Sequence, residues 1–327
     1  MPKVVLLGSD EIALPAFRAV KSLPSVTVAA VYSQPDRPSG RGQEIRPNPV
    51  AAWARAEGLP LLQPERLGPE DAASLASLGA DLGVVMAYGQ LLKDDFLSAT
   101  ARGFVNFHGS LLPSLRGATP VEAAIALGLP LTGVTLQQVV RRLDAGPVHA
   151  RASLSVGPEE GRASLRERIG VLAGEMVPSS LPAVLAGASS PVVQDESAVS
   201  HTRRLAKPDS AMDFNVPSRV LACRVRALEG WPGSVFVHRG ETVKVGSARA
   251  AEGAGEPGLV LEAGRSGVLV ACGEGALLVI RMQLPGGRML AAADFLPGHP
   301  FVPGERIDSR LMPPLVSVAP FPRAGRA

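Results

Sequence analysis

The sequence predicts an α/β protein in which a Rossmann-like domain, with an open and mostly parallel sheet, is followed by a small OB-like β-barrel domain. In the first half of the chain, short apolar runs alternate with helical patterns, which is typical of a parallel sheet covered by helices. In the second half, five β-like runs separated by glycine-containing turns predict the barrel.

The first apolar run, KVVLLG, reads as a buried strand that ends in a glycine, and a helical pattern over residues 10–21 follows it. Further strands are expected at residues 26–32, 81–87, 103–108 and 132–138, and further helices at residues 50–57, 71–77 and 120–127. The first turn, GSDEIALP, lacks the G-x-G-x-x-G pattern that brings a backbone close to a pyrophosphate. A nicotinamide-dependent enzyme is therefore a weak alternative.

A long helical pattern over residues 163–185 closes the first domain, and we expect Pro178 and Pro182 to kink or break it. The small and polar residues of GASSPVVQDESAVS then read as a linker. The strands of the second domain are the runs SVFVHR, ETVKVG, GLVLEA, SGVLVAC and ALLVIRM. The expected boundaries are a first domain at residues 1–189, a linker at 190–208, the barrel at 209–311 and a disordered tail at 312–327.

With 327 residues, the chain is long enough for two domains with separate cores. Its start has too short an apolar run for a signal peptide and no run reaches membrane-spanning length, so we expect a cytoplasmic protein with no membrane partner. Cys223 and Cys272 lack metal-ligand spacing and the five histidines are scattered, so no metal site is expected. The net charge of +3 is too small to decide whether a polyanion binds.

Residues 106–113, NFHGSLLP, hold the strongest chemical signal in the chain. Asn106 and His108 are two positions apart, so on a strand their side chains project from the same face. They come at the carboxyl end of the expected strand 103–108, where ligands bind in open α/β sheets. Two polar groups in this place can act on one reacting atom. The alternative for His108 is a histidine that only satisfies its hydrogen bonds beside a turn.

The run NFHGSLLPSLRGATP, together with LDAG from Leu143, resembles the formyltransferases that use 10-formyltetrahydrofolate. Three further runs, VYSQPDRPSGRG, VVMAYGQLL and MQLPGGRMLAAADFLPG, narrow the resemblance to the methionyl-tRNA formyltransferases over nearly the full length. The resemblance implies that the first domain is catalytic, with Asn106, His108 and Asp144 as its catalytic trio. It also implies a folate-binding set, Gly89, Gln90, Leu91, Leu92, Ser110, Leu111, Leu112 and Pro113, and a tRNA-binding set, Arg37, Arg41, Arg46, Arg203, Arg204 and Lys207.

The implied reaction is the attack of an amine on the formyl carbon of the folate, which places negative charge on the formyl oxygen. Asn106 can donate a hydrogen bond to that oxygen, and so can a protonated His108; one such donor is typically worth ~10²–10³ in rate. Asp144 would hold the imidazolium and could help to accept the proton that leaves the amine through water. Its alternative role is that of an ordinary turn residue in LDAG. The implied partners are the folate donor and initiator methionyl-tRNA, and we expect a monomer.

The chain departs from the family pattern at three places. Gln43 and Glu44 stand where lysines are common, Ser114 stands where an arginine is usual, and the stretch 139–142 reads VVRR before LDAG. Residues 209–312 hold eleven basic and eleven acidic residues, so the expected barrel is neutral. Two alternatives therefore stay open: a formyltransferase whose acceptor is an amino sugar nucleotide, and a folate- or nucleic-acid-binding protein with degenerate catalysis.

Overall fold

The structure is a computed structural model that describes residues 1–39 and 44–322. Contacts between residues divide the chain into two compact units. The first unit holds Met1–Gly117, Thr132–Leu154 and Arg166–Ser200, and the second holds Ala118–Leu131, Ser155–Leu165 and His201–Ala327. Two segments from the first half of the sequence thus belong to the second unit, which the sequence did not indicate.

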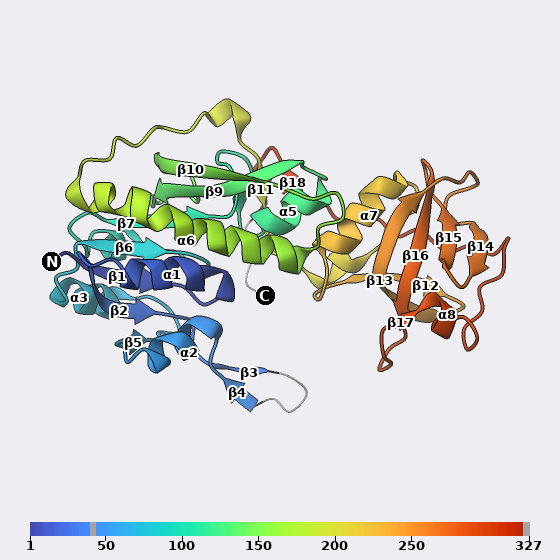
Figure 1. The fold of residues 1–327 in the computed structure, drawn as a ribbon, viewed down its shortest axis with the longest axis horizontal. Coiled ribbons are helices and arrows are strands. Elements are labelled where there is room, and N and C mark those ends of the chain that lie inside the picture. Colours follow the sequence, from blue (N-terminus) through green and yellow to red (C-terminus); the bar gives the residue numbers. More distant parts are fainter. Residues whose placement is uncertain (40–43, 323–327) are drawn as a thin grey trace. The chain divides into compact units, whose positions relative to one another are not determined.

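The first unit is built on a seven-stranded sheet with the strand order β10-β9-β7-β6-β1-β2-β5 (Figure 1). The strands are β1 (Lys3–Leu7), β2 (Thr27–Tyr32), β5 (Leu61–Leu62), β6 (Leu82–Val85), β7 (Phe104–His108), β9 (Leu131–Gln138) and β10 (Val148–Ser155). Strands β5, β2, β1, β6 and β7 pair in parallel, and β9 runs antiparallel to β7. The predicted mostly parallel sheet is confirmed.

Short helices follow the strands as the sequence predicted. They are α1 (Leu14–Lys21), preceded by the 3-10 turn η1 (Glu11–Ala13), then α2 (Pro49–Ala56), α3 (Pro69–Ser77) and α4 (Asp94–Leu97). Helix α2 begins where Asn48 Oδ1 accepts a hydrogen bond from the Ala51 amide (3.0 Å), and Pro49 takes the first helical position, which suits its fixed φ. Before α2, β3 (Arg37–Ser39) and β4 (Glu44–Arg46) pair antiparallel.

The long helix α6 (Arg162–Ala186) continues through Pro178 and Pro182, so of the predicted kink or break, the break does not occur. Each proline removes only one backbone hydrogen bond, and the Ser180 hydroxyl donates to the Met176 carbonyl oxygen at 2.6 Å within this stretch. Val177 and Leu181, which directly precede Pro178 and Pro182, are fully buried. Packing of this apolar side holds the helix together across the prolines.

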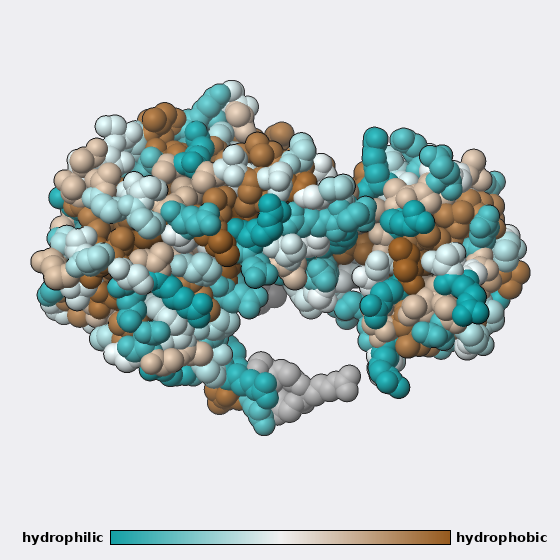
Figure 2. Space-filling model, in the orientation of Figure 1, coloured by the Kyte–Doolittle hydropathy of each residue, from teal (hydrophilic) through white to brown (hydrophobic). Residues whose placement is uncertain are grey.

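By length and composition alone, α6 could cross a membrane, which corrects the expectation that no segment reaches that length. Its side chains Ile169, Ala173 and Val177 are fully buried in the first unit. Gly170 lies against η1, where an added Cβ would come within 2.8 Å of the Ile12 carbonyl oxygen. This is the packing of a core helix. The visible surface of the molecule mixes hydrophilic and hydrophobic residues (Figure 2).

The second unit contains an antiparallel sheet with the strand order β12-β13-β16-β15-β14. The strands are β12 (Ser234–His238), β13 (Glu241–Ala251), β14 (Val260–Gly264), β15 (Gly267–Ala271) and β16 (Ala276–Gln283), and β17 (Leu290–Ala291) pairs with β16. The five predicted strands are confirmed. The helices of the unit are α5 (Pro120–Ala126), α7 (Ser218–Ala227) and α8 (Ala292–Phe295), and the rings of Phe214, Phe236 and Phe301 pack edge to face in its core.

Residues 313–322 differ from the disordered tail that the sequence suggested at 312–327, and residues 323–327 lie outside the described residues. Strand β18 (Val316–Ser317) pairs with β11 (His201–Thr202), and Leu315 is buried. The Arg224 guanidinium donates to the Pro313 carbonyl oxygen at 3.0 Å. These partners lie about a hundred positions earlier in the chain, so no local sequence pattern reveals them. The remaining elements are β8 (Arg116–Gly117) and the 3-10 turns η2 (Glu196–Ala198) and η3 (Lys207–Ser210).

Candidate active site

Strand β7 delivers Asn106 and His108 to one face of the sheet. In the antiparallel pair with β9, Asn106 lies opposite Gln137 and His108 lies opposite Thr135, so all four side chains belong to the same face. Within the described part of the chain, the Asn106 side chain makes no hydrogen bond. Its amide is therefore available as a donor.

The His108 ring is buried and has a defined orientation. Its Nε2 atom lies 2.9 Å from the carbonyl oxygen of Leu115, and a carbonyl can only accept, so Nε2 carries a proton. Leu115 itself adopts a positive φ of 61°, which turns this carbonyl toward the ring. The second ring nitrogen, Nδ1, lies 3.7 Å from Asp144 Oδ2. A proton on Nδ1 would make the ring an imidazolium beside a carboxylate.

Asp144 is held by hydrogen bonds at both carboxylate oxygens. Oδ2 accepts from the Gly117 amide at 2.9 Å, and Oδ1 accepts from Gln137 Nε2 at 2.8 Å. Asp144 adopts a positive φ of 49°, so it does form a turn, yet its carboxylate points at His108. The structure thus brings the expected trio together. Gln137 was not foreseen, although its position opposite Asn106 follows from pairing the two predicted strands.

The predicted folate segment, residues 110–113, continues directly from β7. Thr135 Oγ1 donates to the Ser110 carbonyl oxygen at 2.7 Å and accepts from the Leu112 amide at 3.0 Å. Ser110 and Leu112 are buried, the Ser110 hydroxyl donates to the Ser114 carbonyl oxygen, and Leu111 and Pro113 are half-buried. Core packing is thus one role of Leu112, and the half-buried pair is the part of the segment that a ligand can reach.

The second predicted folate segment, residues 89–92, follows β6, whose Val85 pairs with Asn106. Gly89 has a positive φ of 85°, which favours glycine. The Gln90 amide group is engaged with the Pro64 carbonyl and the Leu67 amide, and Leu92 is buried in the core. Leu91 is 54% exposed. Backbone and Leu91 are therefore the groups that this segment can offer to a ligand.

The cations expected to bind tRNA have different surroundings. Arg37 pairs with Glu65 and Arg46 with Glu44, in exposed ion pairs, and Arg41 lies outside the described residues. Arg203 donates to both carboxylate oxygens of the fully buried Asp209. Burial raises the pKa of Asp209, but the hydrogen bonds from Arg203 and the Ala206 amide outweigh it and lower that pKa overall. Arg204 and Lys207 are exposed.

The stretch 139–142, where the chain departs from the family pattern, is tied to its neighbours. The Val139 amide donates to the Phe104 carbonyl oxygen at 2.7 Å. Arg141 pairs with Asp94 at 3.4 Å and Arg142 pairs with Glu196 at 2.6 Å. The two unusual arginines therefore form exposed ion pairs beside the loop that precedes Asp144.

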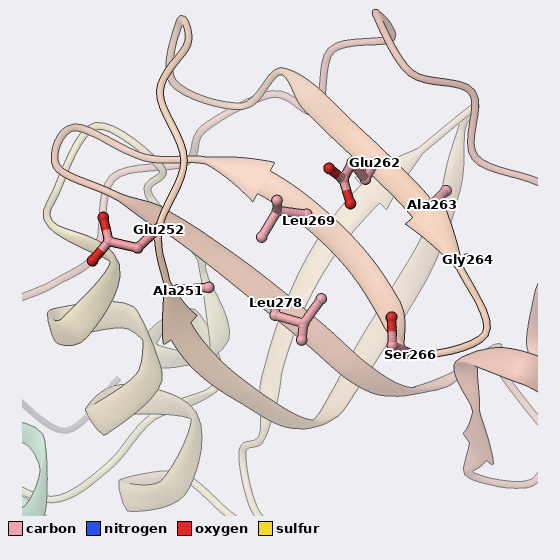
Figure 3. A pocket seen from close by; sticks show the side chains of 9 residues that line it. Ala251, Glu252, Glu262, Ala263, Gly264, Ser266, Leu269 and Leu278 are labelled. Carbon is pink, nitrogen blue, oxygen red and sulfur yellow. The ribbon is translucent and has the colours of Figure 1, made fainter.

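Two cavities lie away from the trio. One, of about 460 Å³, is lined in the first unit by residues that include Arg102, Gln138, His149 and Ser189. The other, of about 270 Å³, lies on the sheet of the second unit, where Leu269 and Leu278 lie on neighbouring strands between Glu252 and Glu262 (Figure 3). Neither contains Asn106, His108 or Asp144. Among the described residues, no group of three or more potential metal ligands occurs.

Comparison with known proteins defines the class. Residues 3–181 match the formyl transferase family and residues 204–300 match the formyl transferase C-terminal domain. A methionyl-tRNA formyltransferase from Myxococcus xanthus is 40% identical over 93% of this chain and 97% of its own length. A second one, from Stutzerimonas stutzeri, is 40% identical over 89% of this chain and 93% of its own length.

The chain belongs to the methionyl-tRNA formyltransferase family. Among solved structures, an N-formyltransferase from Helicobacter canadensis, in complex with folinic acid and dTDP-3-aminofucose, has a similar fold. It is 13% identical, with a TM-score of 0.66, and the match covers 85% of this chain and 99% of the other. The predicted resemblance to the family is confirmed.

Proposed function

We propose that this protein transfers the formyl group of 10-formyltetrahydrofolate to the amino group of methionyl-initiator tRNA, as its relatives' names indicate for them. The observation that supports this reaction most directly is the placement of Asn106 and His108 on one sheet face, with the Asp144 carboxylate beside the ring. The expected product is formylmethionyl-tRNA, which serves translation initiation. The protein would act in the cytoplasm as a monomer.

The two donors would stabilise the tetrahedral intermediate. When the amine nitrogen attacks, the carbonyl π electrons move to the formyl oxygen, and the Asn106 amide and a protonated His108 donate to that oxyanion. His108 Nε2 is occupied by the Leu115 carbonyl, so Nδ1 is the ring atom that can donate to the substrate. Its 3.7 Å separation from Asp144 leaves Nδ1 without a strong bond to the carboxylate.

The proton of the attacking amine needs an acceptor. Asp144 can take it through a water, because among the described residues the carboxylate accepts two direct hydrogen bonds, from Gly117 and Gln137, and it has further lone pairs. The intermediate then collapses: the bond from the formyl carbon to N10 of the folate breaks, N10 takes the proton that left the amine, and tetrahydrofolate leaves. No covalent bond to the protein is required.

For the folate donor, we propose the segments 89–92 and 110–113, which both continue from the carboxyl ends of neighbouring strands, β6 and β7. This is the edge where ligands bind in open α/β sheets. For the tRNA, we propose the segment 37–46, in which Arg37 begins β3, Arg46 ends β4 and Arg41 lies outside the described residues, and we propose Arg203, Arg204 and Lys207. Of these residues, Arg37, Arg46, Arg204 and Lys207 are exposed cations that would contact phosphates.

The test is an assay with 10-formyltetrahydrofolate labelled in the formyl group and with charged initiator tRNA. Label should appear on the methionyl amine, and uncharged tRNA is the control. A parallel arm offers a dTDP-linked amino sugar, since the Helicobacter canadensis protein is described with such a ligand. Label on the sugar alone would show that the acceptor is an amino sugar and not the tRNA. Label on neither would indicate a binding protein with degenerate catalysis.

A further inference from the structure

The backbone of Asp144 is held by a residue from the segment that the sequence suggested to be a linker. Gln194 is 4% exposed, and its Nε2 atom donates to the carbonyl oxygens of Asp144 (2.9 Å) and Gly146 (2.8 Å). Asp144 has a positive φ, which residues with a side chain rarely adopt. The two hydrogen bonds thus brace the turn that presents the Asp144 carboxylate.

A buried arginine fixes which way the Gln194 amide points. Arg116 is fully buried, and its Nε and Nη2 atoms donate to Gln194 Oε1 at 3.1 and 2.8 Å. A guanidinium has donors and no acceptor, so the oxygen of Gln194 must face Arg116. The nitrogen of Gln194 must then face the Asp144 turn. The orientation is determined by chemistry and needs no assumption about the amide.

The hydrogen bonds keep the same donor-to-acceptor direction as far as the Asp144 carboxylate. Gln194 Nε2 also lies 3.3 Å from Gln137 Oε1, so the Gln137 oxygen faces Gln194. The Gln137 nitrogen therefore faces Asp144, where it donates to Oδ1 at 2.8 Å. Donors point one way along Arg116, Gln194, Gln137 and Asp144, and the carboxylate at the end faces His108.

The charge of Arg116 is balanced at the surface. Glu196 accepts from Arg116 at 2.8 Å and from Arg142 at 2.6 Å. The hydrogen bond from Arg116 and, to a smaller extent, that from Arg142 hold the pKa of Glu196 below its ordinary value. A buried guanidinium thus keeps an ionised partner, and this partner also holds the 139–142 stretch.

We propose that Gln194 is a positioning residue for formyl transfer: it sets the Asp144 turn and the Gln137 amide, so that the carboxylate faces His108. This inference rests on the proposed function. Gln194 is not placed to contact the amine nitrogen or the formyl carbon, so its effect on the rate acts through Asp144.

The test substitution is Gln194→Glu, which keeps the size of the side chain and an acceptor for Arg116 but removes the donors to the Asp144 turn. We expect kcat to fall roughly 10–100-fold, because small displacements of a catalytic group cost this much. KM for folate and for tRNA should change little. Activity should partly return on going from about pH 7.5 to about pH 6, since a displaced carboxylate stabilises the imidazolium less.

A double-mutant cycle with Asp144→Asn separates positioning from general damage. If Gln194 acts through Asp144, Gln194→Glu should lower kcat by less than about twofold in the Asp144→Asn background. Gln138→Glu is the matched control: Gln138 is the next residue on β9, and its amide bonds to Arg102 and His149 on the other face. It should leave kcat and the pH profile unchanged.

A folded Gln194→Glu protein with wild-type kcat and pH profile would overturn the inference, as would losses that multiply in the double variant. If Gln194→Glu melts below the assay temperature, Gln194→Met tests the same loss of donors without adding a charge. Wild-type protein that forms no formylmethionyl-tRNA would instead refute the proposed function, so the two failures are distinguishable.

Discussion

The imidazole of His108 and the carboxylate of Asp144 face each other with 3.7 Å between Nδ1 and Oδ2, and both side chains are nearly buried. This distance is too long for a direct hydrogen bond, yet it allows a strong attraction when the ring is protonated, because little water screens the pair. An oxygen of the substrate could therefore accept from Nδ1 while Asp144 stabilises the charge of the ring.

Loss of either oxyanion donor should lower turnover strongly. We expect Asn106→Ala and His108→Ala each to reduce kcat by roughly 10²–10⁴ with little change in melting temperature, because the donors act on charge that develops only in the transition state. His149→Ala, at a half-buried histidine of β10 outside the site, is the control and should retain activity. Near-normal kcat in a folded Asn106→Ala or His108→Ala protein would remove the oxyanion assignment.

Asp144→Asn should make activity depend on pH. The substitution keeps the shape of the side chain but removes the anion that lies 3.7 Å from His108 Nδ1, so a protonated ring loses its counter-charge. We expect kcat to fall and then to recover partly between about pH 7.5 and about pH 6. The measurement is a pH–rate profile of variant and wild type in the same buffers. A variant rate that stays flat over this range would assign Asp144 another role.

The catalytic pair could be predicted from the sequence because its signal is local. Asn106 and His108 are two residues apart on a strand, and the period of two places them on one face wherever that strand lies in the sheet. The five strands of the second unit were also predictable, since each is a short β-branched run between glycine turns. These features depend on neighbours in the sequence.

The support of Asp144 could not be predicted in this way. Arg116 and Gln194 are 78 residues apart, and Gln194 sits among small polar residues that read as a linker. Their hydrogen bonds arise only when the chain after α6 returns to the carboxyl end of the sheet. The unbroken α6 has the same origin, because burial of Val177 and Leu181 outweighs the local effect of Pro178.

In the second unit, Glu305 should stabilise the fold in a pH-dependent way. Hydrogen bonds from Arg239, from the Val302 amide and from His238 lower the pKa of Glu305 to about 2. Because the folded-state pKa lies below the unfolded one, this contribution is present above about pH 4.5 and is lost as the pH falls toward about 2. Glu305→Gln should therefore lower the melting temperature at neutral pH, and the difference from wild type should shrink on acidification.

Glu256→Gln is the matched control for this substitution, because Glu256 pairs with Arg306 at an exposed position. Exposed pairs contribute little, so its melting temperature should follow that of wild type at every pH. A Glu305→Gln protein whose deficit stays constant from neutral to acidic pH would show that packing, and not the charge of Glu305, is the cause.

Substitutions of Lys207 and Arg203 should have different effects, the first on tRNA binding and the second on folding stability. Lys207 is exposed and, in the described part of the chain, has no carboxylate within ion-pair distance, so Lys207→Ala should raise KM for charged tRNA without changing the melting temperature. If Lys207 contacts a phosphate, the slope of log binding constant against log salt should decrease by about 0.9 or less.

Arg203 instead holds the buried Asp209, so Arg203→Ala should cost roughly 3–5 kcal/mol of folding free energy. The measurements are salt-dependent tRNA binding and thermal melting of both variants. Unchanged tRNA KM and salt slope for folded Lys207→Ala would remove Lys207 from the proposed tRNA contacts, and an unchanged melting temperature for Arg203→Ala would contradict its structural role.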